Sequence, residues 1–426
     1  MNPTTFESPL LREHYTRIDH KSGLPIYVFP KPFATTYAIL ATRYGSTDVC
    51  FSPAGDGSFL TVPDGVAHFL EHKLFDNPDG SDAMARFSAL GADANAYTDY
   101  RRTAYLFSCT EHFDESLEEL LRFVYSPYFT DASVKKEQGI IAEEIRMYDD
   151  SPWDRCLQQL LEGMYAKNPV RRNVCGTAES ISRITPDLLM TCYRTFYQPS
   201  NMALVVCGNV APEEVAAVAD KVLPHAIPAR PILRREPEEP RAIAKSYAEL
   251  TMQVAKPIFT IGFKDPDIPA DPAARMRRDA AVSLLGEVIF SRAEPFFSNL
   301  FESGKLTASY SYGYSICDSF AFFCVSGESD RPEEIRDVLL DSVARLRETG
   351  IDPAVFERCR RILLADSVRA FDSTEEIAND LLSFVFDGVN LFDYPTVLSA
   401  VSLTEVSDLL SSLFRPENLS LSVVKG

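Results

Sequence analysis

The sequence predicts an α+β protein built from two similar domains, each with a mostly antiparallel sheet covered by helices. Three observations support this prediction. The chain has 426 residues, which is long for one domain, and 46% of them are hydrophobic, enough for sizeable cores. Short strand-like runs occur together with longer amphipathic segments typical of helices. The same order of elements restarts after a proline-rich, charged stretch near the middle.

The first half is expected to begin with strands at 15–19, 26–29 and 36–44, separated by turn signals such as Ser22-Gly23. Asp64 is expected to cap the first helix, and Thr185 to cap a later one that has Pro186 at its first position. The predicted helices are 66–75, 81–89, 114–125, 131–150, 153–166 and 186–196, and further strands are predicted at 94–100, 103–108 and 201–207.

The stretch 224–240 is rich in proline and charge and is typical of an exposed linker, although a long loop inside one domain is the alternative. After it we expect strands at 246–253, 257–263, 307–314, 320–326 and 419–424, and helices at 272–290, 294–302, 333–349, 353–371, 374–386 and 402–413. The predicted organisation is therefore a first domain at 1–225, a linker at 226–245 and a second domain at 246–426.

Charge and cysteine content limit the partners and the compartment. The formal net charge of −19 argues against nucleic acid or an anionic membrane surface as the main partner, and most of these charges are expected to be solvated. The nine cysteines are scattered, odd in number and without a C-x-x-C pair, which indicates reduced thiols and a cytoplasmic location. Residues 1–12 lack the apolar core of a signal peptide, and no apolar run is long enough to span a membrane.

The stretch around His68 and His72 has the form His-x-x-Glu-His. On a helix, the two histidines lie one turn apart on the same face, a spacing that suits two imidazoles binding one zinc ion. Glu71 can reach the same point and accept a proton from water that the metal activates. The alternative is a pair of polar residues on a half-buried helix. The metal-site interpretation is favoured because an acidic residue elsewhere in the chain is available as a third ligand.

Zinc needs one more protein ligand here, and an acid from another helix is the expected source. The best candidates lie between residues 137 and 145. Glu137 and Glu144 are seven residues apart and share a helix face, whereas Glu143 points about a quarter-turn away. The other histidines are each expected at the surface: His14, His20, His112 and His225.

These motifs resemble the inverzincin metallopeptidases, the insulinase/pitrilysin family, in its small bacterial processing-peptidase-like branch. The family pattern is His-x-x-Glu-His followed by two glutamates seven apart on one helix, and the resemblance covers essentially the whole chain. It implies that His68, His72 and Glu144 bind Zn²⁺. It also implies that Glu71 is the general base and that Glu137 orients a ligand from outside the metal's own shell.

The family's Asn-Ala-aromatic strand matches Asn95, Ala96 and Tyr97. The resemblance implies that this strand is a sheet edge that pairs with extended substrate backbone. A plain edge or core strand is the alternative.

The second half resembles the family's non-catalytic domain, where an arginine and a tyrosine contact the substrate carbonyl. The arginine is absent. Its place falls on Ser303 when one counts back from the tyrosine, and on Lys305 when one counts forward from the upstream Leu-Phe pair. Arg292 could substitute for it. Tyr310 is the expected tyrosine, with a part in stabilising the oxyanion, and Tyr312 is the alternative. A tyrosine on an apolar strand can equally be a core side chain.

The resemblance as a whole implies a zinc-dependent endopeptidase that hydrolyses unstructured peptides or short polypeptides in a cavity enclosed by the two domains. A subunit of a peptide-maturation or protein-modification complex, with little general proteolysis, is the main alternative. A metal-binding structural protein is a third. The expected partners are a peptide substrate and a second subunit, in a homodimer or in a heterodimer with a paralogue, with no nucleic acid and no membrane.

Overall fold

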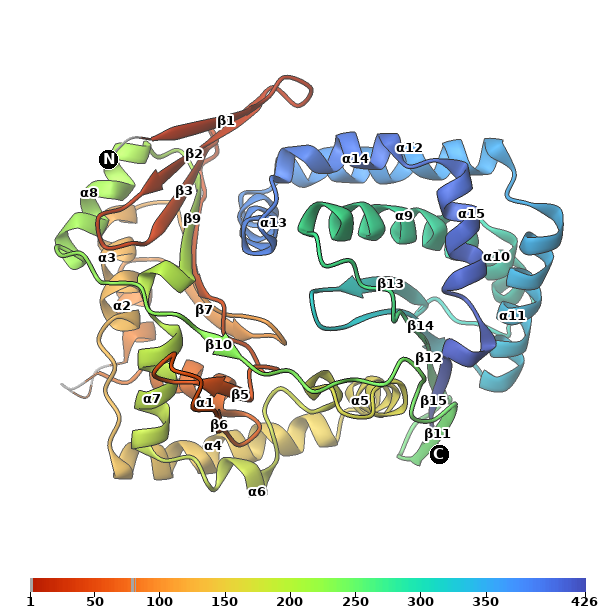
Figure 1. Ribbon diagram of the computed structural model, residues 1–426, viewed down its shortest axis with the longest axis horizontal. Helices are drawn as coiled ribbons and strands as arrows, with labels where there is room; N and C mark the ends of the chain where they lie inside the picture. The colour runs from red at the N-terminus through yellow and green to blue at the C-terminus, as the bar shows by residue number, and fades with distance from the viewer. Residues whose placement is uncertain (1–2, 78–79, 81) are drawn as a thin grey trace. The chain divides into compact units, whose positions relative to one another are not determined.

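The computed structural model describes residues 3–77, 80 and 82–426, and it confirms the α+β class. The chain folds into two compact units, each around its own sheet (Figure 1). Both units are discontinuous in sequence, unlike the contiguous ranges 1–225 and 246–426 expected above. The first comprises Met1–Ile145, Asn173–Arg235 and Val368–Phe392, and the second Arg146–Arg172, Glu236–Ser367 and Asp393–Gly426.

The first unit contains a seven-stranded sheet with the order β1-β2-β3-β9-β4-β8-β7, so β7 is an edge strand. Neighbouring strands are antiparallel except β3 and β9, which are parallel. The strands are β1 (Thr4–Ser8), β2 (Glu13–Asp19), β3 (Pro25–Pro30), β4 (Thr36–Thr42), β7 (Asp93–Thr98), β8 (Thr103–Cys109) and β9 (Met202–Gly208). A second, small sheet joins β5 (Cys50–Ser52), β6 (Leu60–Thr61) and β10 (Leu233–Arg234).

Helices cover both faces of the seven-stranded sheet (Figure 1). The helix α13 (Thr374–Asp387) packs on one face, and α3 (Phe113–Val124) and α8 (Pro212–Val222) pack on the other. This is why β4 and β9 are buried along their whole length and read as continuous apolar runs. On β4, Ile39 and Ala41 belong to the core that α13 closes. No element was predicted where α8 lies, so the sequence interpretation missed it.

The second unit contains a five-stranded sheet with the order β11-β15-β12-β14-β13, antiparallel except for the parallel pair β11 and β15. The strands are β11 (Tyr247–Thr251), β12 (Ile258–Lys264), β13 (Ser311–Ile316), β14 (Ala321–Glu328) and β15 (Leu419–Lys425). The helix α9 (Pro272–Phe290) packs against β13, and α5 (Pro152–Met164) packs against β12 and β15. Gly262 permits this approach, because a Cβ there would lie 2.8 Å from the side chains of Leu160 and Met164.

Each half of the chain therefore contributes one helix to the sheet of the other half: α5 to the second unit and α13 to the first. The other helices are α1 (Val66–Lys73), α2 (Ala83–Ala89), α4 (Asp131–Asp149), α6 (Ala178–Ile181), α7 (Pro186–Phe196), α10 (Pro295–Glu302), α11 (Pro332–Thr349), α12 (Pro353–Arg369), α14 (Tyr394–Ala400) and α15 (Leu403–Ser412). The predicted elements recur with ends shifted by a few residues, while α6 and α14 were not predicted. Ser81, the expected start of the second helix, lies outside the described residues.

The segment predicted as an exposed linker is anchored by local contacts. Leu233 and Arg234 pair with Ser52 and Phe51 in the small sheet. Further along, the buried Lys264 donates hydrogen bonds to Glu239 Oε1 at 2.6 Å and to the Pro240 carbonyl at 2.7 Å. The unit boundary, between Arg235 and Glu236, lies inside the predicted linker range of 226–245.

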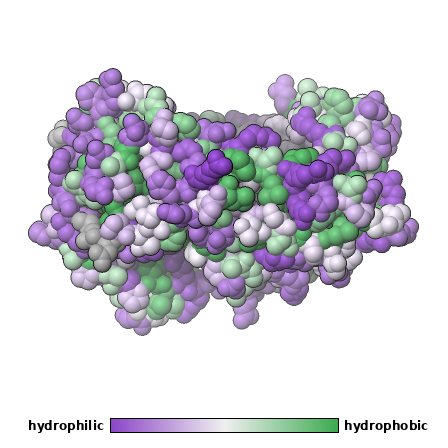
Figure 2. All heavy atoms as spheres, turned by 90° about the horizontal axis from the view of Figure 1, so that it is seen from above, coloured by the Kyte–Doolittle hydropathy of each residue, from purple (hydrophilic) through white to green (hydrophobic). Residues whose placement is uncertain are grey.

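Across residues 3–77, 80 and 82–426, no helix combines the length and the apolar character that a membrane span requires. Figure 2 shows hydrophilic side chains spread over the visible face, as expected for a chain with a formal net charge of −19.

Candidate metal centre

The motif helix α1 begins at a tight crossing of two backbone segments. The prediction that Asp64 caps this helix was wrong, because the N-cap is Gly65, with φ of 89° and no side-chain cap. A Cβ on Gly65 would lie 2.4 Å from the Cys175 carbonyl oxygen, and one on Gly176 would lie 2.4 Å from the Asp64 carbonyl oxygen. The Ser180 hydroxyl also donates to Asp64 O at 2.8 Å. Glycine at both positions therefore fixes where the motif helix starts.

The helices α1 and α4 bring three ligand side chains together, all within the first unit. His68 and His72 lie on one face of α1, with ring centroids 4.6 Å apart. From α4, Glu144 Oε1 lies 3.5 Å from His68 Nε2, and Glu144 Oε2 lies 3.4 Å from His72 Nε2. In the part of the chain that the structure describes, these residues form the one group of three or more histidine, cysteine or acidic side chains whose ligand atoms all lie within 4.8 Å of one another.

The spacing of these atoms fits a tetrahedral cation. With bonds of about 2.0–2.1 Å to nitrogen and oxygen, neighbouring ligands of tetrahedral zinc lie about 3.3–3.4 Å apart. The separations of His68 Nε2 from Glu144 Oε1, 3.5 Å, and of His72 Nε2 from Glu144 Oε2, 3.4 Å, are close to that edge length. They exceed the roughly 2.7–2.9 Å of a charge-assisted hydrogen bond. The three side chains therefore lie close enough together to share one ion.

Glu137 supports the histidine at the C-terminal end of the motif. It is buried on the same face of α4 as Glu144, and its Oε1 lies 3.1 Å from His72 Nδ1. A proton on Nδ1 shared with this carboxylate leaves the Nε2 lone pair directed at the centre, the usual arrangement behind a metal-bound histidine. His68 lacks such support: its Nδ1 is buried without a hydrogen-bond partner among the described residues.

The same contacts shift the pKa values of the ligands. Burial opposes a charge on His72, but the carboxylates of Glu137 and Glu144 outweigh it and raise the pKa of His72 to about 10. Hydrogen bonding with His68, and then with His72, holds the pKa of Glu144 far below its usual range. A metal ion binding here must displace the proton from Nε2 of His72, because a metal ligand is a neutral imidazole, which keeps its other proton on Nδ1.

Glu71 lies beside the three ligands with a partner that the sequence interpretation missed. Its side chain is 6% exposed, and Thr98 Oγ1 donates to its Oε2 at 2.5 Å. Burial raises the pKa of Glu71 against the opposing effects of His68, the Thr98 hydrogen bond and His72. Strand alternation could have identified Thr98, because it shares a strand face with Ala96, two residues earlier.

Cys175 is a second residue that sequence reasoning did not connect with the centre. Its Sγ is buried 3.8 Å from His68 Nε2, and burial raises its pKa to about 12, so the group is a thiol. No motif in the sequence identifies it, because its position depends on the backbone crossing at Gly65.

The strand that carries Asn95, Ala96 and Tyr97 is the edge strand β7. The Ala96 amide donates to Asn95 Oδ1 at 2.9 Å rather than to β8, so it faces the open side of the strand. The Tyr97 hydroxyl donates to Asn379 Oδ1 of α13 at 3.4 Å. The edge position agrees with the sequence prediction, and substrate binding by these residues stays a prediction.

Tyr310 belongs to the second unit and is 4% exposed there. Its hydroxyl donates to the Phe290 carbonyl at 3.0 Å, and burial raises its pKa. The Tyr312 hydroxyl donates to Glu287 Oε2 at 2.5 Å, and Arg292 donates to the Ala308 carbonyl at 3.0 Å. Each of these groups thus has a partner within the second unit, and the expected role of Tyr310 in catalysis stays a prediction.

The remaining histidines contribute nothing to the centre. His14, His112 and His225 are exposed, as predicted. The prediction was wrong for His20, which is 3% exposed and lies with its Nε2 3.0 Å from Asp220 Oδ1. Its position at the end of β2 did not reveal that α8 covers it.

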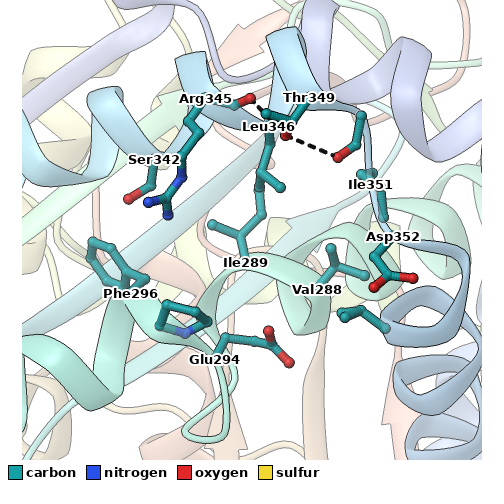
Figure 3. A pocket seen from close by; sticks show the side chains of 13 residues that line it. Val288, Ile289, Glu294, Phe296, Ser342, Arg345, Leu346, Thr349, Ile351 and Asp352 are labelled. Carbon is teal, nitrogen blue, oxygen red and sulfur yellow. Dashed lines mark hydrogen bonds between the residues drawn. The ribbon is translucent and has the colours of Figure 1, made fainter.

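A cavity of about 250 Å³ lies within the second unit, between α9, α10 and α11 (Figure 3). Its walls are largely apolar, with Ile289, Phe296 and Leu346 pointing inward. Its acidic residues already have partners: Glu294 pairs with Arg358, and Asp352 accepts the Ala354 amide. The cavity therefore offers no ligand group comparable to the one in the first unit.

Comparison with known proteins agrees with the geometry. The family model described as "Insulinase (Peptidase family M16)" matches residues 56–178, and the one described as "Peptidase M16 inactive domain" matches residues 183–363. The chain is 37% identical over 406 residues to the uncharacterized zinc protease YmfH of Bacillus subtilis strain 168, covering 95% of this chain and 94% of that one.

Solved structures extend the likeness to the whole fold. An M16-like peptidase from Alicyclobacillus acidocaldarius superposes with a TM-score of 0.93 at 33% identity, over 99% of each chain. A protease from Helicobacter pylori shares the fold, with a TM-score of 0.83 at 18% identity, over 97% of this chain and 100% of that one. With its converging histidine and glutamate ligands, the chain belongs to the insulinase family, peptidase family M16, whose relatives are named zinc proteases.

Proposed function

We propose that this chain is a zinc-dependent endopeptidase that hydrolyses peptide bonds of unstructured peptides or short polypeptides. The observation that carries the proposal is the convergence of His68, His72 and Glu144 at tetrahedral spacing, with the buried Glu71 beside them. Two neutral imidazoles and one carboxylate leave a fourth position of zinc for water, as catalytic sites require and structural sites do not.

The proposed mechanism assigns one task to each side chain. When bound by these ligands, zinc acidifies water and polarises the scissile carbonyl. Glu71 accepts the proton, so that the water oxygen can attack the carbonyl carbon, and Glu71 then returns the proton to the leaving amine nitrogen. Glu137 holds the His72 ring so that Nε2 keeps its direction.

Substrate binding is proposed at the open side of β7. An extended peptide can add to a sheet edge through backbone hydrogen bonds, which requires the substrate to be unfolded locally. The outward amide of Ala96 is one donor for such pairing, once the Asn95 side chain releases it. Because Thr98 of the same strand contacts Glu71, a peptide on this edge lies near the proposed base.

The first unit is proposed as the catalytic one, because it holds all three proposed ligands, and the second as non-catalytic. Most of residues 183–363, which match the family's inactive domain, lie in the second unit. A role for Tyr310 toward the oxyanion, a second subunit and a cytoplasmic location remain part of the proposal.

Removing the metal is expected to abolish peptide cleavage, and adding one equivalent of zinc is expected to restore it. The measurement is cleavage of a quenched, unstructured peptide by protein treated with a chelator and then dialysed, before and after titration with zinc. A folded protein containing the same peptide sequence serves as the control and should stay intact. Undiminished cleavage after complete removal of zinc would refute the proposal.

A further inference from the structure

The hydrogen bond between Thr98 and Glu71 belongs to a short network that anchors the proposed base to the sheet. Thr98 Oγ1 donates to Glu71 Oε2 at 2.5 Å and lies 3.2 Å from Thr103 Oγ1. Thr103 is fully buried and donates to the Tyr44 carbonyl at 2.9 Å. Thr98 and Thr103 also face each other in the β7–β8 register, so their positions are set by the strand pairing itself.

Counting hydroxyl protons assigns the direction of each bond. A threonine hydroxyl has one proton, and a backbone carbonyl can only accept. Thr103 therefore gives its proton to Tyr44 O, and Thr98 gives its own to the Glu71 carboxylate, where the hydrogen bond is charge-assisted and strongest. The contact left without a proton, between the two hydroxyl oxygens, is the longest of the three at 3.2 Å.

This arrangement fixes a side chain that otherwise has freedom. A glutamate has three rotatable side-chain bonds, and among the described residues Thr98 alone makes a hydrogen bond with the Glu71 side chain. A base must be held within a fraction of an ångström of its working position, since a misplacement of about 1 Å can cost about a hundredfold in rate.

We propose that Thr98 is a positioning residue that holds the Glu71 carboxylate in its working orientation. The proposal rests on the proposed function, in which Glu71 is the base. Because Thr98 is the last residue of β7, the edge that would receive substrate and the group that holds the base are parts of one strand. Displacement of β7 therefore moves the base as well as the substrate-binding edge.

The test compares three variants of the full-length, zinc-loaded protein. Thr98→Val removes the hydroxyl at nearly constant volume, and Thr98→Ser keeps it. Thr47→Val is the matched control: the Thr47 hydroxyl donates to the Tyr100 carbonyl in the turn between β7 and β8, at 2.6 Å, and does not touch Glu71. The backbone bond from the Thr47 amide to the same carbonyl remains in that control.

Thr98→Val is expected to lower kcat about 10- to 100-fold, with KM and zinc content unchanged, because the lost contact orients a reacting group rather than binding substrate. Thr98→Ser is expected to recover most of kcat, and Thr47→Val to keep it. Normal kcat in Thr98→Val would overturn the proposal. So would a loss that serine does not rescue, since that would indicate that the strand needs the threonine only for its fold.

Crystal structures of the zinc-loaded wild type and of Thr98→Val give a readout that does not depend on activity. The Glu71 carboxylate is expected in one orientation in the wild type and in another, or in several, in the variant. An unchanged Glu71 in Thr98→Val would overturn the positioning role. If the zinc-loaded wild type cleaves no peptide at all, the proposed function fails instead, and the two crystal structures still decide whether Thr98 positions Glu71.

Discussion

Glu71→Gln is expected to lower kcat for peptide hydrolysis about 10²- to 10⁴-fold, the usual contribution of a general base. Glutamine has almost the same shape and its carbonyl oxygen can still accept the hydrogen bond from Thr98, but it cannot take a proton from water. The three metal ligands are unchanged, so the variant should bind one zinc as tightly as the wild type. The measurement pairs kcat on a quenched peptide with zinc content by elemental analysis.

The zinc measurement is the internal control for this variant. A protein that has lost both zinc and activity reports damage to the site and not the loss of a base. Normal turnover by zinc-loaded Glu71→Gln would contradict the mechanism, and a different group would then have to accept the proton.

Glu144→Gln is expected to weaken zinc binding by about 100-fold or more. Loss of a residue that only hydrogen-bonds to a metal ligand typically weakens binding by roughly 10- to 100-fold, and loss of a ligand should exceed that. The carboxylate supplies the only negative charge among the three proposed ligands, and it lies 3.5 and 3.4 Å from the two histidine nitrogens. A neutral amide of the same size removes that charge while keeping the packing of α4. Competition with a chelating zinc indicator measures the affinity.

Glu143→Gln is the matched control, because Glu143 is the preceding residue of α4 and is exposed. It is expected to bind zinc as the wild type does. Glu137→Ala should fall between the two, since the buried Glu137 only orients His72. Unchanged affinity in Glu144→Gln with a loss in Glu143→Gln would reverse the assignment of the third ligand.

The centre could be predicted from the sequence because its geometry is local to two helices. The spacing of His68 and His72 places both on one face of α1, and the spacing of Glu137 and Glu144 does the same on α4. Catalytic zinc sites can combine two histidines with one acidic ligand, which predicts that the two helix faces meet at one ion. The structure brings together all four of these side chains.

What the sequence did not reveal depends on contacts between distant segments. The helices α5 and α13 are predictable from their apolar periodicity, but periodicity does not tell which sheet a helix covers. Asp64 was expected to cap the motif helix, whereas the N-cap is Gly65, whose missing Cβ admits the Cys175 carbonyl. His20 was expected at the surface because α8, which buries it, had not been predicted.

The most direct test of the metal centre is a crystal structure of the zinc-loaded wild type with anomalous data collected on both sides of the zinc absorption edge. The account predicts one strong peak within bonding distance, about 2.0–2.2 Å, of His68 Nε2, His72 Nε2 and a carboxylate oxygen of Glu144. A zinc peak bound by other residues, or one that lacks Glu144 among its ligands, would contradict it.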